Sequence, residues 1–187
     1  MDNRIEYLLL ILAAVKSGTI AALINTTVRG EGLRHVLNVA NAKAIFIGAS
    51  HLDKFNSSLT DEERGNLIIV GIDDQEKVPS DIQDLQSIEK NSTPCDEVTT
   101  TFKEACMYMY TSGTTSNPKG CPLSHKNVLH VANSMVDRWK MNDKDVFWDP
   151  LPMFHMSSIL PFIGCSISKS TFSFFNFSIH LFFLLFS

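Results

Sequence analysis

The sequence predicts an α/β fold in which a mainly parallel sheet is flanked by helices. Short apolar runs of the kind that form buried strands alternate with longer segments of helical periodicity, an order typical of strand–helix–strand units. The chain has 187 residues, of which 44% are hydrophobic, so it is long enough to bury a sizeable core. We therefore expect helices on both faces of the sheet.

The first expected elements form a helix–strand–helix unit. Ile5–Lys16 consists mostly of helix-forming residues, and Gly18 follows it as a stop signal. Thr19–Ile24 is a short apolar strand. Glu31–Asn41 is amphipathic, because apolar side chains recur on one helical face: Leu33, Val36, Leu37 and Ala40.

Two further strands are expected at Lys43–Ile47 and Leu67–Ile72, because both are continuous apolar runs. The polar segment His51–Leu59 between them is a helix candidate, and Ile82–Lys90 is a weaker one. Residues 91–103 are polar, contain a proline and several threonines, and indicate a linker.

The alternation continues beyond this linker. It predicts a strand at Ala105–Tyr110, a loop, a helix at Lys126–Trp139 and a strand at Val146–Leu151. The sequence contains no internal repeat.

Composition changes once, near Ser166. Residues 166–187 contain seven of the thirteen phenylalanines and one charged residue, Lys169. They show neither helical nor alternating periodicity. We favour a non-native hydrophobic tail on an interrupted coding sequence; a membrane anchor and a pair of core strands are the alternatives.

Charge and cysteine usage exclude several classes of protein. The balance of 16 − 20 = −4 provides no basic face, so we expect no nucleic-acid partner. The four cysteines lack the short spacings of zinc sites, so no metal site is expected. We interpret the apolar run Tyr7–Val15 as part of a buried helix in a cytoplasmic protein rather than a secretory signal, because Asp2 and Glu6 offset Arg4.

The segment 110–120, YTSGTTSNPKG, carries the candidate binding chemistry. Its glycines allow successive backbone N–H groups to point at an anion, its hydroxyls add donors, and Lys119 supplies a mobile positive charge. It is not a Walker A loop, because Pro118 stands where that loop has glycine before the lysine. From the residues alone, a loop that cradles a polyphosphate and a flexible Ser/Thr linker both remain open.

This loop, followed by Ser124-His125 and a helix, resembles the signature of the adenylate-forming superfamily, the acyl-CoA synthetases and their relatives. Other segments are similar to that family in order and spacing: DNRIEY, KSG, AALIN, RGEGL and DPLPMFHM, the last resembling the family's P-x-F-H motif. The resemblance covers residues 1 to about 165. Within the family, the pattern is most similar to ligases for fatty acids or carnitine-type acids.

The resemblance implies a two-step reaction that uses ATP, Mg²⁺ and coenzyme A on a small-molecule carboxylate. ATP and the carboxylate give an acyl-adenylate and pyrophosphate, and coenzyme A then takes the acyl group as a thioester. His155 would lie near the carboxylate as the candidate catalytic residue; a packed or helix-starting histidine is the alternative. His125 is interpreted as a structural residue at a helix start. By position, seven residues would embrace the ATP phosphates: Thr111, Ser112, Gly113, Thr114, Thr115, Lys119 and Gly120.

The sequence also departs from the family pattern. Ser116 stands where glycine is usual, and Ser157-Ser158 replace a glycine-containing turn. The family's later adenine, magnesium and ribose motifs and its C-terminal domain have no counterpart. We therefore expect residues 1–165 to be a partial AMP-binding domain that is inactive alone, because the site assembles from both domains. The alternative is a non-catalytic remnant that binds nucleotide, or that contacts a membrane through residues 166–187, which we do not favour.

Overall fold

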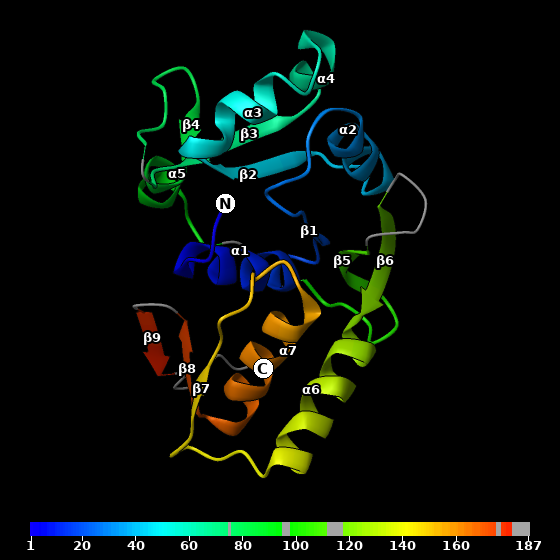
Figure 1. The fold of residues 1–187 in the computed structure, drawn as a ribbon, viewed down its shortest axis with the longest axis vertical. Coiled ribbons are helices and arrows are strands. Elements are labelled where there is room, and N and C mark those ends of the chain that lie inside the picture. Colours follow the sequence, from blue (N-terminus) through cyan, green and yellow to red (C-terminus); the bar gives the residue numbers. More distant parts are fainter. Residues whose placement is uncertain (75, 95–97, 112–117, 175–176, 181–187) are drawn as a thin grey trace.

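The computed structural model describes residues 1–74, 76–94, 98–111 and 118–174, and the backbone of residues 177–180. Their strands form three sheets of three strands each (Figure 1). The first has the order β1 (Ala21–Leu23), β5 (Ala105–Thr111), β6 (Lys119–Ser124). The second has the order β2 (Ala44–Gly48), β3 (Ile68–Ile72), β4 (Gln83–Asp84). The third has the order β7 (Val146–Trp148), β8 (Thr171–Phe174), β9 (Phe177–His180).

Parallel pairing predominates in these sheets. β1 is parallel to β5, β2 to β3, β3 to β4, and β7 to β8, whereas β6 and β9 are antiparallel to β5 and β8. The predicted α/β class, with parallel-containing sheets flanked by helices, is confirmed. The sequence pattern does not predict β6, because Gly120 and Pro122 disfavour a strand there.

Helices connect and cover the strands. They are α1 (Ile5–Lys16), α2 (Gly30–Val39), the 3-10 turn η1 (Ala49–His51), α3 (Leu52–Asn56), α4 (Asp61–Gly65), α5 (Leu85–Asn91), α6 (His125–Trp139) and α7 (Met156–Ser168). α6 begins after Ser124, whose hydroxyl accepts a hydrogen bond from the Asn127 N–H, and it ends at Lys140 in a left-handed conformation. The predicted helix, Lys126–Trp139, begins one residue later than α6 and ends at the same residue.

Most of the core lies in two clusters. The larger joins α1, β5, α6 and α7 through side chains such as Leu8, Met107, Ala132 and Phe162. The smaller joins α2, β2, η1 and α3 around Val36, Ile47 and Phe55. Figure 1 shows the β2–β3–β4 sheet on one side of α1 and the α6–α7 pair on the other, with the N-terminus between α1 and β2.

The segment after residue 165 continues directly from this core. α7 runs through to Ser168, and β8 then pairs with β7. Phe172 has no exposed surface and Phe174 is 2% exposed; both belong to the larger cluster. Of the helices in the described ranges, none has the length and apolar character needed to cross a membrane.

Candidate functional site

The candidate phosphate loop joins two antiparallel strands. Thr111 ends β5 and lies opposite Lys119, which begins β6, so both ends of the loop are held at one point of the sheet. Both side chains are exposed. Four more of the predicted phosphate-binding residues lie outside the described residues: Ser112, Gly113, Thr114 and Thr115.

Gly120 lies at a close approach between β6 and α2. It pairs with Tyr110 of β5, and a Cβ added at Gly120 would lie 2.7 Å from Cγ1 of Val39. Since real Cβ contacts are longer, glycine lets α2 pack against the base of the loop. Gly120 therefore has a packing role beside the predicted phosphate role.

Two side chains form hydrogen bonds between α2 and the strands at the base of the loop. The Tyr110 hydroxyl donates a 2.8 Å hydrogen bond to the carbonyl oxygen of Val36. His35 Nε2 lies 3.0 Å from the carbonyl oxygen of Pro118, to which it donates in the tautomer that carries a proton on Nε2. Burial raises the pKa of Tyr110 to about 12, so its hydroxyl keeps its proton at neutral pH. Neither contact could be predicted from spacing, because the partners are backbone oxygens of distant segments.

A second group of contacts fixes the loop that carries His155. The buried Asp149 carboxylate accepts hydrogen bonds from the Leu151 N–H, at 3.0 Å, and from the Ser158 hydroxyl. Asn3 reaches the same loop, since its Nδ2 donates to the Leu151 carbonyl at 2.7 Å and its Oδ1 accepts from the Met153 N–H at 2.8 Å. These contacts fix the shape of the loop.

His155 is the residue immediately before α7. Its carbonyl oxygen accepts from the N–H groups of Ser158 and Ile159, and its ring lies 4.4 Å from the Phe154 ring, centroid to centroid. The residue is exposed. Among the described residues, no hydrogen bond or ion pair joins His155 to Thr111, Lys119 or Gly120. The exposed imidazole can contact a substrate, while the backbone carbonyl of His155 accepts the first hydrogen bonds of α7.

His125 has a different setting. It is the first residue of α6, and its N–H donates to the Glu104 carbonyl at 3.1 Å. This position supports the structural interpretation of His125.

The α/β fold of this chain is shared with the N-terminal domains of adenylate-forming CoA ligases. The chain belongs to the AMP-binding enzyme family, whose model matches residues 1–181. This match confirms the resemblance noted in the sequence.

The curated relatives are longer proteins, and this chain matches only a part of each. It is 30% identical over 175 residues to long-chain fatty acid transport protein 6 of Mus musculus, covering 88% of this chain and 27% of that protein. It is 27% identical over 162 residues to the long-chain-fatty-acid–CoA ligase FadD13 of Mycobacterium tuberculosis, covering 85% of this chain and 30% of that protein. The chain thus spans less than a third of either relative.

The fold similarity extends over almost the whole chain. A putative long-chain-fatty-acid CoA ligase from Rhodopseudomonas palustris superposes with a TM-score of 0.81 at 19% identity, covering 92% of this chain and 42% of that one. The inhibitor-bound N-terminal domain of FACL13 from Mycobacterium tuberculosis gives a TM-score of 0.77 at 24% identity, covering 94% and 42%. At these identities the similarity establishes the fold.

Proposed function

We propose that this chain supplies the ATP-phosphate loop and part of the carboxylate site of an ATP-dependent carboxylate–CoA ligase. The observation that carries the proposal is the β5–β6 pairing, which sets Thr111 and Lys119 opposite each other at the base of a glycine- and hydroxyl-rich loop. An ATP-bound structure of MatB, similar in fold, supports ATP as the nucleotide.

In the first half-reaction, a carboxylate oxygen of the substrate forms a bond to the α-phosphorus of ATP. The bond from that phosphorus to the bridging oxygen of the β-phosphate breaks, and pyrophosphate leaves with added negative charge. Hydroxyl donors such as Thr111 and the Lys119 ammonium group stabilise this charge, as do the backbone N–H groups of the loop. In the second half-reaction, the thiolate of coenzyme A attacks the acyl carbon and AMP leaves.

His155 is proposed to face the carboxylate that is activated. The Asp149 and Asn3 contacts hold its loop, so the imidazole would be positioned without reorganisation when substrate binds. His155 then orients the acid or shapes its pocket.

Mg²⁺ is part of the proposal only because membership of the family implies it. No group of three or more metal-ligating side chains occurs in the described part of the chain. Mg²⁺ at nucleotide sites is often held mainly by phosphates and one or two carboxylates, but among the described residues no ion pair joins a carboxylate to Lys119. We assign no residue of this chain to the ion, nor to coenzyme A.

The second candidate is a non-catalytic nucleotide-binding protein located in the cytoplasm. Nucleotide binding alone would need only the loop whose exposed ends, Thr111 and Lys119, lie opposite each other in the β5–β6 pair.

Two measurements distinguish these functions. Binding of a fluorescent ATP analogue tests the phosphate loop, and ATP–pyrophosphate exchange with a panel of carboxylic acids tests adenylation. We expect the chain alone to bind ATP but to show only background ATP–pyrophosphate exchange. A protein completed with the rest of a relative should catalyse that exchange. Failure of both proteins to bind ATP would contradict the phosphate-loop assignment.

A further inference from the structure

Helix α2 contacts both neighbours of Lys119 in the chain. His35 Nε2 lies 3.0 Å from the carbonyl oxygen of Pro118, and a Cβ added at Gly120 would lie 2.7 Å from Cγ1 of Val39. His35 and Val39 are four residues apart in α2, so they lie on the same side of the helix. One side of α2 therefore supports the residue before Lys119 and the residue after it.

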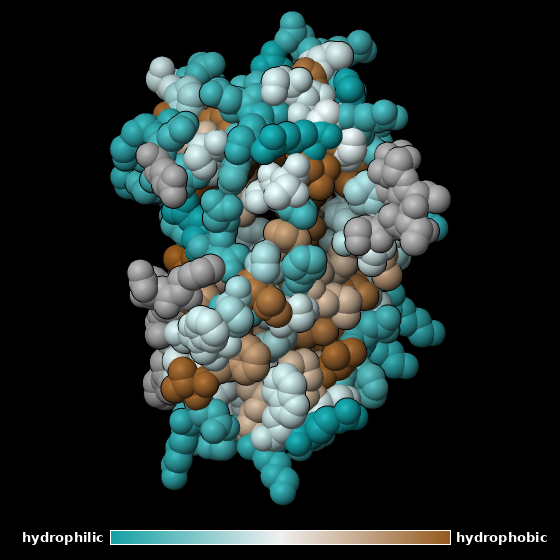
Figure 2. Space-filling model, in the orientation of Figure 1, coloured by the Kyte–Doolittle hydropathy of each residue, from teal (hydrophilic) through white to brown (hydrophobic). Residues whose placement is uncertain are grey.

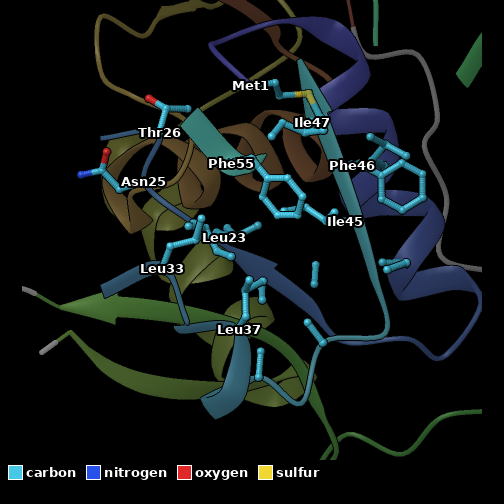
Figure 3. A pocket seen from close by; sticks show the side chains of 18 of the residues that line it. Met1, Leu23, Asn25, Thr26, Leu33, Leu37, Ile45, Phe46, Ile47 and Phe55 are labelled. Atoms are coloured by element: carbon cyan, nitrogen blue, oxygen red, sulfur yellow. The ribbon is translucent and has the colours of Figure 1, made fainter. Parts of the chain in front are cut away.

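The opposite side of α2 is packed into the core. Leu33 and Leu37 each stand two residues before His35 or Val39, which places them about 200° away around the helix. Both leucines belong to the apolar cluster that α2 shares with β2 and α3. Figure 3 shows them across a space from Ile45 of β2. Apolar packing thus fixes α2 from one side and leaves its other side to support β6.

Strand geometry directs the Lys119 side chain away from α2. Successive side chains of a strand point to opposite faces. The Cβ direction of Gly120 points at Val39 of α2, so the Lys119 side chain lies on the face away from this helix, and it is exposed. The backbone of Lys119 is therefore supported by α2, while its ammonium group remains accessible to a phosphate.

His35 provides the polar contact in this support. In the tautomer with a proton on Nε2, the imidazole donates to the Pro118 carbonyl, 83 positions further along the chain. Because proline has no backbone N–H, this carbonyl is the one hydrogen-bonding group of Pro118. It shares a planar peptide group with the Lys119 N–H, so a partner that holds the carbonyl also orients the backbone of Lys119.

We propose that His35 is a positioning residue for Lys119. Its hydrogen bond to Pro118 sets the backbone from which the Lys119 ammonium group reaches the ATP phosphates, and His35 itself need not touch them. Holding a charged donor in place before the ligand arrives lowers the entropic cost of binding. This inference rests on the proposed phosphate role of Lys119.

The test measures binding of a fluorescent ATP analogue to the full chain by anisotropy. It compares His35→Leu with His35→Gln, because both introduced residues favour helices but only glutamine keeps an N–H for the Pro118 carbonyl. We expect His35→Leu to weaken binding about threefold to tenfold, the range that one hydrogen bond supplies, and His35→Gln to weaken it less than about twofold. His35→Ala is a second variant without the donor and should match His35→Leu.

His130→Leu is the matched control, because His130 is an exposed histidine of another helix, α6. Figure 2 shows mainly hydrophilic residues along the lower right edge of the molecule, where α6 lies. Binding of the ATP analogue should be unchanged in this variant. Urea unfolding checks that every variant is folded under the conditions of the binding measurement.

A double-mutant cycle tests whether His35 acts through Lys119. In a Lys119→Ala background, adding His35→Leu should change the affinity by less than about twofold, because the group that His35 positions is gone. A purely structural role of His35 would weaken binding by the same factor with and without Lys119.

Three results would overturn this inference and leave the phosphate loop in place. They are wild-type affinity in His35→Leu, equal losses in His35→Leu and His35→Gln, and an undiminished effect of His35→Leu in the Lys119→Ala background. Absence of ATP binding by the wild type would instead contradict the proposed function, and this inference with it.

Discussion

The side-chain oxygen of Asn3 accepts a 2.8 Å hydrogen bond from the backbone N–H of Met153, a residue 150 positions away in the chain. The same amide donates to the Leu151 carbonyl, so one side chain fixes two points of the loop before His155. The segment before α1 and the candidate carboxylate site are therefore mechanically joined.

Replacement of this amide should destabilise the fold. Asn3→Ala removes two hydrogen bonds to backbone, and we expect a loss of about 1–3 kcal/mol in the free energy of unfolding. Asn133→Ala on α6, whose amide donates to a carbonyl of its own helix, is the control and should change stability by less than about 0.5 kcal/mol. Urea unfolding measures both; equal effects would show that the Asn3 contacts contribute nothing specific.

Lys119 should matter more to catalysis than to ATP binding. In a chimera that completes residues 1–165 with the rest of FadD13, we expect Lys119→Ala to lower kcat for adenylation roughly 10²-fold, because charge on pyrophosphate grows in the transition state. ATP affinity should fall less, since other loop donors remain. Lys126→Ala on the surface of α6 is the control. Wild-type exchange rates for Lys119→Ala would favour the flexible-linker interpretation.

Tyr110 gives a pH-dependent contribution to stability. Its pKa is raised by burial to about 12 in the folded chain, against about 10 in an unfolded chain. The unfolded state therefore loses the phenol proton first, and the stability contributed by the neutral hydroxyl falls as pH rises from about 10 towards 12. Unfolding of the wild type and of Tyr110→Phe, measured from pH ~9 to ~11, should show the wild type losing stability more steeply. Parallel curves would contradict this.

A substitution at Phe172 tests whether the segment after residue 165 is part of the folded core. This side chain is fully buried, so Phe172→Ala should cost about 3–5 kcal/mol. Phe102→Ala, at a side chain that is 68% exposed, should cost far less. Cooperative unfolding that survives unchanged in Phe172→Ala, and in a chain ending at residue 165, would instead support the interpretation of residues 166–187 as a non-native tail.

The elements that the sequence predicts well are those with an unambiguous period. β2 and β3 are continuous apolar runs, and α2 and α6 have one apolar face each. α7 could not be predicted, because Ile159–Cys165 is buried on every side and has no polar face to set a period.

The candidate site also has one part that the sequence predicts and one part that it does not. Its loop composition and the P-x-F-H motif are local, and both are visible in the sequence. Asn3, His35 and Asp149 act through contacts with segments that only the folded chain brings near them, and their spacing contains no signal of those roles.

The pairing of Thr111 with Lys119 has a consequence for the entropy of nucleotide binding. Bringing the ends of a loop together costs conformational entropy, and here that cost is met when β5 and β6 pair, before ATP arrives. Nucleotide binding therefore carries no further cost for bringing Thr111 and Lys119 together. The same closure lets the loop change length at little expense, since doubling a loop adds only about 0.6 kcal/mol, so loops of different lengths could be carried on one unchanged pair of strands.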